Sequence, residues 1–210
     1  MRTHLRFGPI ALASHQIALN TVSLTYMVPL GVSSAAAVRV GQALGRKDIA
    51  AAELSGWTAI FMGAAFMSAA AVMLLLVPRQ IARVYTPEES VIRAAVTLLA
   101  FGAAFQLCDG VQTVATGALR GAGETRMPML CHLLGYWVIG LPIGAFLCFR
   151  MHWGIPGLWS GLSLALILIG VVLLVVWKRE IHSLQIKPEL QQLFESEIEG
   201  GTSPRRRPRR

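Results

Sequence analysis

Five long stretches of this sequence carry almost no charge, and they constrain the fold more than any other feature. The stretches lie between Arg6 and Arg39, Glu53 and Arg79, Arg93 and Arg120, Arg126 and Arg150, and Arg150 and Lys178. Asp109 is the only charged side chain inside any of them. Each stretch is long enough for the ~20 residues with which an apolar helix crosses a bilayer. We therefore expect an all-α membrane protein with five spanning helices, at 14–38, 56–77, 92–118, 128–149 and 155–177.

The composition favours the same class of protein. Of the 210 residues, 54% are hydrophobic and only 14% are charged, against about 25% charged residues in an ordinary soluble domain. So few charged side chains cannot cover the surface of a water-soluble domain. The apolar and polar residues also lack the alternation with a period of two that half-buried strands show. A soluble domain is therefore not expected, and neither are membrane strands.

The positive charge is concentrated at the C-terminus. The formal net charge is +8, and five arginines lie within the last six residues, Arg205–Arg210. We expect residues 1–178 to form the membrane domain, residues 179–199 an amphipathic segment at the cytoplasmic surface, and residues 200–210 a disordered basic tail. A basic tail could contact nucleic acid or anionic lipid, but a solvated end is the usual behaviour of such termini, so nucleic acid is not an expected partner.

The distribution of Lys and Arg around the spans predicts the orientation in the membrane. One side receives Arg39, Arg46, Lys47, Arg120, Arg126 and the tail from Lys178 onward; the other receives Arg2, Arg6, Arg79, Arg83, Arg93 and Arg150. We therefore expect a cytoplasmic C-terminus and an N-terminus outside. An odd number of spans with an outside N-terminus leads us to expect a chain that has lost its beginning.

Asp109 is the most informative single residue. A charge near the middle of a membrane helix costs roughly 2.5–3.5 kcal/mol on insertion scales, so such a residue usually has a partner or faces a cavity. Its helical neighbours at three, four or seven residues form a candidate cavity lining: Phe105, Gln106, Gln112, Thr113 and Thr116. A carboxyl group withdrawn from water can exchange a proton near physiological pH, and its oxygens can also help to hold Na⁺. The alternative is a structural Asp that only joins helices.

The first span carries a second polar stripe and a predicted break. Gln16 and Asn20 share one helical face, so they either line a cavity or bond to a neighbouring helix. Pro29 and Gly31 follow, and we expect them to interrupt or kink this helix because proline removes a backbone hydrogen bond. The sequence contains no nucleophile elbow, phosphate loop or zinc-protease motif, and its cysteines have no metal-ligand spacing. Enzymatic activity and a cofactor are therefore not expected.

Several segments together resemble bacterial transporters of the multidrug and toxic compound extrusion (MATE) family. The first group is ASHQIALN at 13–20, MVPLG at 27–31 and VRVGQALG at 38–45; the second is FQLCDGVQ at 105–112 and GALRGAGETR at 117–126. The resemblance covers residues 8–178. It implies that residues 1–178 form part of the C-terminal lobe, similar to helices eight to twelve of a twelve-helix fold with two lobes.

The resemblance also implies roles for single residues. The family's acidic residue of helix ten falls on Asp109, which would belong to a cation site that binds H⁺ or Na⁺. The aromatic residue that the family places one turn earlier, often Tyr, is Phe105 here. The usual Glu of helix seven has no counterpart in this sequence.

Two hypotheses for the function follow. The first is a cation-coupled antiporter, driven by H⁺ or Na⁺, that exports cationic amphipathic drugs. Its partners would be the drugs, the lipid bilayer of the bacterial inner membrane and a separate chain that supplies the N-terminal lobe. The alternative is a membrane remnant or assembly partner that does not transport and comes from a truncated gene.

Overall fold

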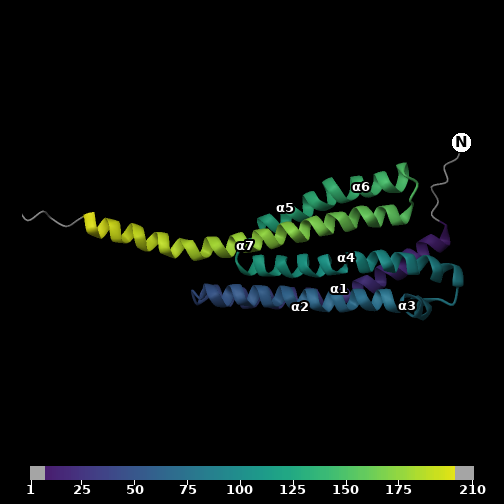
Figure 1. The fold of residues 1–210 in the computed structure, drawn as a ribbon, viewed down its shortest axis with the longest axis horizontal. Helices are drawn as coiled ribbons and strands as arrows, with labels where there is room; N and C mark the ends of the chain where they lie inside the picture. Colours follow the sequence, from purple (N-terminus) through teal and green to yellow (C-terminus); the bar gives the residue numbers. More distant parts are fainter. Residues whose placement is uncertain (1–7, 202–210) are drawn as a thin grey trace, which may run out of the picture.

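The computed structural model describes the backbone of residues 8–201 and the side chains of residues 8–186, and this part of the chain is built of helices (Figure 1). The long helices are α1 (Pro9–Gly45), α2 (Ile49–Leu76), α4 (Glu89–Gly121) and α7 (Ile155–Gly201). The remaining span, Arg126–Arg150, is a continuous succession of α5 (Arg126–Leu134), the π-helix η1 (Gly135–Gly140), α6 (Leu141–Ala145) and the π-helix η2 (Phe146–Arg150). Five helical stretches are long and apolar enough to cross a membrane. The predicted all-α membrane fold with five spans is confirmed.

The observed helices extend beyond the predicted spans. Helix α7 continues through 179–199, so the segment expected to lie at the membrane surface is a direct extension of the fifth span. Its side chains beyond residue 186, and the tail at 202–210, lie outside the described residues. A short helix that the sequence did not predict, α3 (Pro78–Tyr85), connects α2 to α4. Pro78 occupies its first turn, where the missing N–H of proline would have no intrahelical partner.

The first helix is not broken at Pro29 and Gly31, and a kink at these residues stays a prediction. Helix α1 runs from Pro9 to Gly45 without a break, and Pro29 is buried inside it. Proline cannot donate to the carbonyl of Thr25, four residues earlier, so this turn lacks one backbone bond. The Gln106 side chain of α4 contacts the same turn, with its Nε2 donating to Thr25 Oγ1 at 2.5 Å. Packing against α4 therefore supports the helix at the position that proline weakens.

Helix α4 lies at the centre of the bundle and packs against α1, α2, α3 and α7. Small residues allow these close approaches: a Cβ atom at Gly117 would collide with the backbone of Ser33 on α1, and one at Gly110 would collide with Met67 on α2. Such contacts between small residues are typical of membrane helices, whose association depends on van der Waals packing. The central position of α4 keeps Asp109 away from the lipid.

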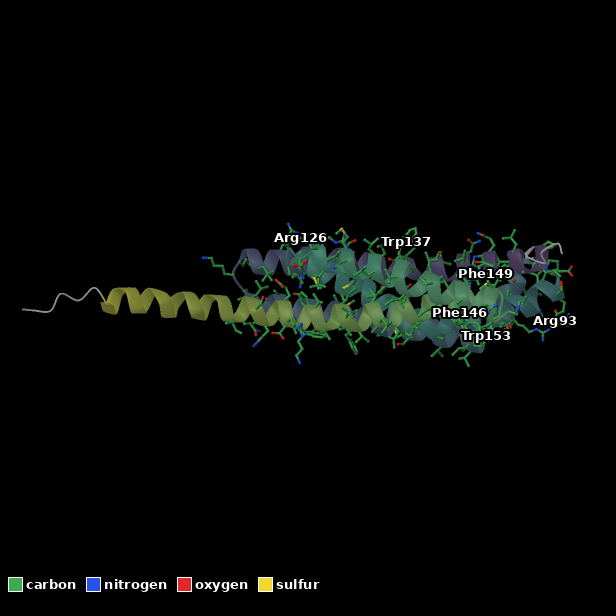
Figure 2. The ribbon with its side chains drawn as sticks, turned by 90° about the horizontal axis from the view of Figure 1, so that it is seen from above. Arg93, Arg126, Trp137, Phe146, Phe149 and Trp153 are labelled. Carbon is green, nitrogen blue, oxygen red and sulfur yellow. The ribbon has the colours of Figure 1, made fainter. Side chains whose placement is uncertain are left out.

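The fourth span packs mainly on α7, which lies between it and the other helices in Figure 1. Gly161 of α7 faces the backbone of Gly144 of α6 so closely that a Cβ atom at Gly161 would collide with it. On the outside of the same span, Trp137, Phe146 and Phe149 are exposed along its length (Figure 2). Exposed large apolar side chains are expected where a helix faces lipid.

Candidate functional site

Asp109 lies on the buried side of α4 and forms one end of a hydrogen-bonded chain. Asp109 is only 9% exposed. Gln112, one turn further along α4, donates from Nε2 to Asp109 Oδ1 at 3.0 Å. The same nitrogen donates to the Tyr136 hydroxyl at 3.2 Å. One amide group therefore joins the carboxylate of α4 to the π-helix η1 of the fourth span.

A cavity of about 350 Å³ opens beside this chain, between α1, α4 and the fourth span. Four of its lining residues were predicted from the sequence: Asp109, Gln112, Thr113 and Thr116. The others are Tyr26, Leu30 and Ser33 from α1, Arg120 from α4, His132 from α5 and Tyr136 from η1. The predicted polar stripe of α4 thus forms one wall, and the two neighbouring spans supply the other walls.

Sequence reasoning missed the cavity residues outside α4. Tyr26, His132 and Tyr136 come from spans distant in sequence, so helical spacing from Asp109 could not identify them. One signal was present, because His132 and Tyr136 are four residues apart and so share a helical face within an otherwise apolar span. That pairing would have marked the face of the fourth span that looks toward Asp109.

Two predicted lining residues lie close to Asp109 in sequence but do not line this cavity. Phe105 is buried against Trp159 of α7, with ring centroids 5.7 Å apart. Gln106 is fully buried and contacts Thr25 of α1 through the hydrogen bond described above. Both residues therefore hold α4 against its neighbours.

The polar stripe of α1 also lies elsewhere. Gln16 and Asn20 are both exposed, and Gln16 Nε2 donates to Asn20 Oδ1 at 3.2 Å. Gly31, one of the two predicted hinge residues, is exposed within the continuous helix α1. None of these three residues lines the cavity at Asp109.

The cavity contains both acidic and basic groups. Arg120 and His132 line it together with Asp109, the only carboxylate in the lining. His132 Nδ1 lies 2.7 Å from the carbonyl oxygen of Pro128, and a carbonyl can only accept, so Nδ1 is the donor. A second cavity of about 240 Å³ adjoins at Thr116, Arg120 and His132 and extends toward Glu124 and Thr125 at the end of the bundle. The two adjoining cavities together run from the carboxylate to one end of the spans.

Other features of the described residues are less suited to a functional site. A larger cavity of about 540 Å³ lies near Gly8, Thr97 and Trp153, but its lining is mainly apolar and contains no titratable group. No group of three or more His, Cys, Asp or Glu side chains within residues 8–186 could hold a metal ion. The cavity at Asp109 is therefore the best candidate site.

Comparison with known proteins identifies relatives of this chain. The MatE family pattern matches residues 1–146. A protein named "Probable multidrug resistance protein NorM" from Brucella suis is 42% identical over 181 residues, which is 84% of this chain and 38% of that protein. The "Multidrug resistance protein NorM" of Burkholderia vietnamiensis is 44% identical over 176 residues, 81% of this chain and 38% of its own length. The chain thus spans well under half the length of these relatives.

Solved structures share the fold. A crystal structure of a MATE protein in a bent conformation superimposes with a TM-score of 0.79 at 17% sequence identity, covering 86% of this chain and 40% of the other. At this identity the similarity concerns the arrangement of the helices.

Proposed function

The chain belongs to the MatE family of membrane transporters, and on this premise we propose that it contributes to a multidrug efflux transporter. The relatives that carry the name multidrug resistance protein are more than twice as long as the part this chain matches. The proposal therefore concerns a transporter in which these five spans form part of one lobe. Asp109, buried beside a polar cavity in the central helix, is the observation that carries it.

We propose that Asp109 couples export to the movement of a proton. A buried carboxylate is unstable without a positive charge nearby, and within the described residues Asp109 forms no ion pair with Lys or Arg. A proton or the positive charge of a drug can fill this role, but not both at once. Binding of a proton to Asp109 would therefore displace a cationic, amphipathic drug, and loss of the proton would reset the site.

The composition of the cavity favours H⁺ over Na⁺ as the coupling ion. Na⁺ is best held by several carboxylate or carbonyl oxygens, whereas Asp109 is the only carboxylate in the lining. A proton needs only a single basic oxygen, which Asp109 supplies.

We also propose that the protein resides in the bacterial inner membrane with its C-terminus in the cytoplasm. The support is the excess of Lys and Arg near one end of the spans. Arg126 and Arg93 lie at opposite ends of the bundle (Figure 2), as this orientation requires.

The experiment restores a chain of full family length. Residues 1–210 are joined behind the N-terminal part of the Brucella suis relative and expressed in an efflux-deficient bacterium, and the accumulation of ethidium is measured. We expect the fusion to lower accumulation below the vector control. Asp109→Asn should return accumulation to the vector level, because an amide can neither exchange a proton nor attract a cation. The 210-residue chain expressed by itself should also remain at the vector level.

Glu88→Gln provides the matched control. It makes the same acid-to-amide change at an exposed residue that precedes α4, far from the cavity. This variant should transport like the unmodified fusion. An Asp109→Asn fusion that is expressed normally and still exports ethidium would remove Asp109 from the mechanism. A well-inserted fusion without any export would count against the proposed function as a whole.

A further inference from the structure

We propose that Gln112 senses the proton on Asp109 and transmits its presence to Tyr136 by reversing its side-chain amide. This inference rests on the proposed function, since it takes Asp109 as the residue that exchanges the proton. Gln112 acts here as a positioning residue, because it contacts Asp109 and need not contact the drug. The signal would pass from the central helix α4 to the π-helix η1 of the fourth span.

The hydrogen bonds of Gln112 suit ionised Asp109 better than protonated Asp109. Gln112 is 3% exposed, and its Nε2 makes the bonds to Asp109 Oδ1 at 3.0 Å and to the Tyr136 hydroxyl at 3.2 Å. These two bonds use both amide hydrogens. An ionised carboxylate can only accept hydrogen bonds, so the arrangement matches ionised Asp109.

The opposite end of the same amide is left without a partner. Gln112 Oε1 is fully buried and accepts no hydrogen bond from any described group. A buried polar atom without a partner is costly, and most such atoms in native proteins are paired. This free oxygen is the acceptor on the same amide that a protonated Asp109 would need.

Protonation of Asp109 creates a second state of the amide. One O–H bond forms on the carboxyl group, no bond breaks, and the group becomes a donor. The amide hydrogen facing it now meets a weaker acceptor, since hydrogen bonds to charged groups are roughly twice as strong as neutral ones. Reversal of the amide turns Oε1 toward both partners, and its two lone pairs accept the new O–H of Asp109 and the phenolic O–H of Tyr136.

The two states therefore differ at Tyr136, which changes from an acceptor to a donor. Tyr136 lies in η1, and π-helical segments occur frequently at functional sites. A change at this residue can bias the packing of the fourth span against α4 and α7.

The other titratable groups near Asp109 form no hydrogen bond with the Gln112 side chain. They are Tyr26 of α1, Cys108 and Arg120 of α4 and His132 of α5, while α2 and α7 contribute none to the cavity lining. Among the described side chains, only Asp109 and Tyr136 form hydrogen bonds with the Gln112 side chain. The Gln112 amide is therefore the direct connection between the proton site and the fourth span.

Infrared difference spectroscopy can test the proposal on the 210-residue chain in lipid nanodiscs. Spectra are recorded between mildly alkaline and mildly acidic pH, with ring-deuterated tyrosine to identify the tyrosine C–O band. The chain contains only three tyrosines. We expect a carboxylic C=O band from Asp109 and, over the same pH range, a shift of one tyrosine C–O band. Tyr136→Phe should abolish the tyrosine shift and keep the carboxylic band.

Two further variants distinguish loss of the Gln112 hydrogen bonds from any other change in the cavity. Gln112→Met keeps the length of the side chain but removes both hydrogen bonds, so it should abolish the tyrosine shift while the carboxylic band remains. Tyr26→Phe removes a hydroxyl from the same cavity without touching the Gln112 bonds, and both signals should persist. Circular dichroism confirms that each variant is helical.

The outcomes distinguish this inference from the proposed function. A carboxylic band that disappears in Asp109→Asn, together with a tyrosine shift that survives in Gln112→Met or Tyr136→Phe, would overturn the inference alone. The absence of any tyrosine shift in the unmodified chain beside a clear Asp109 band would do the same. The absence of a carboxylic band sensitive to Asp109→Asn would overturn proton exchange at Asp109 itself.

Discussion

At the scale of single residues, a few buried polar side chains join one helix of this bundle to another. Ser33 of α1 donates from Oγ to the backbone carbonyl of Thr113 on α4 at 2.8 Å, and Ser33 is 1% exposed. Hydrogen bonds between membrane helices contribute about 0.6 kcal/mol on average and at most about 1.7 kcal/mol. Each bond is modest, yet Ser33 and Thr113 both line the cavity at Asp109. Such bonds thus fix the walls of the site as well as the fold.

Ser33→Ala should lower the free energy of unfolding by about 0.6–1.7 kcal/mol, because it removes this interhelical bond and leaves the packing intact. The measurement is unfolding of the 210-residue chain by SDS in mixed micelles, followed by circular dichroism. Ser34→Ala is the matched control, since the Ser34 hydroxyl is exposed and bonds only to Leu30 of its own helix. The control should change stability by less than about 0.5 kcal/mol. Equal losses in the two variants would contradict this account of Ser33.

At the scale of helices, the sequence could predict which elements exist but not how they meet. Long uncharged stretches directly reflect the apolar interior of a bilayer, so all five spans were predictable. The π-helices of the fourth span were not, because hydrogen bonds between residues five apart leave no periodicity that composition reveals. The short helix α3 was missed for a similar reason, since its eight residues include charged and apolar side chains in a segment that resembles a loop.

The candidate site could be predicted only along one helix. Spacing from Asp109 correctly placed Gln112 and Thr116 beside the cavity, but it also included Phe105 and Gln106. These two residues are one turn nearer the start of α4, where Trp159 of α7 and Thr25 of α1 cover the helix. The spacing of residues within α4 does not reveal which neighbouring helices cover each part of it, so the sequence could not show where the cavity ends.

Close packing of α7 on the fourth span depends on glycine. We expect Gly161→Leu to destabilise the chain by about 1–3 kcal/mol or more, because a side chain there must push α7 away from the backbone of Gly144. Gly31→Leu makes the same change at an exposed helical position with no atom within 4 Å of the added Cβ, and it should have little effect. Unfolding in SDS provides the measurement. A Gly161→Leu chain as stable as the unmodified one would show that the two helices can separate without cost.

At the scale of the whole molecule, the two ends of the bundle differ in charge and in structure. One end contains the α1–α2 turn with Arg46 and Lys47, and α7 extends beyond the bundle at this end (Figure 1). The opposite end contains α3 and the loop before α7, where Arg79 of α3 forms an ion pair with Glu89 of α4. The adjoining cavities lead from Asp109 toward the first end, past Arg120 and Glu124. In the proposed orientation, that end faces the cytoplasm.

This orientation predicts opposite behaviour for reporters at the two ends. A fluorescent protein fused after Arg210 should be bright and alkaline phosphatase at the same position inactive, because the first matures in the cytoplasm and the second only outside it. Phosphatase inserted between Met151 and His152, in the loop before α7, should be active because that loop belongs to the other end. Both fusions are compared at equal expression in membrane fractions. Active phosphatase after Arg210 would reverse the orientation, and the cavity beside Glu124 would then open to the outside of the cell.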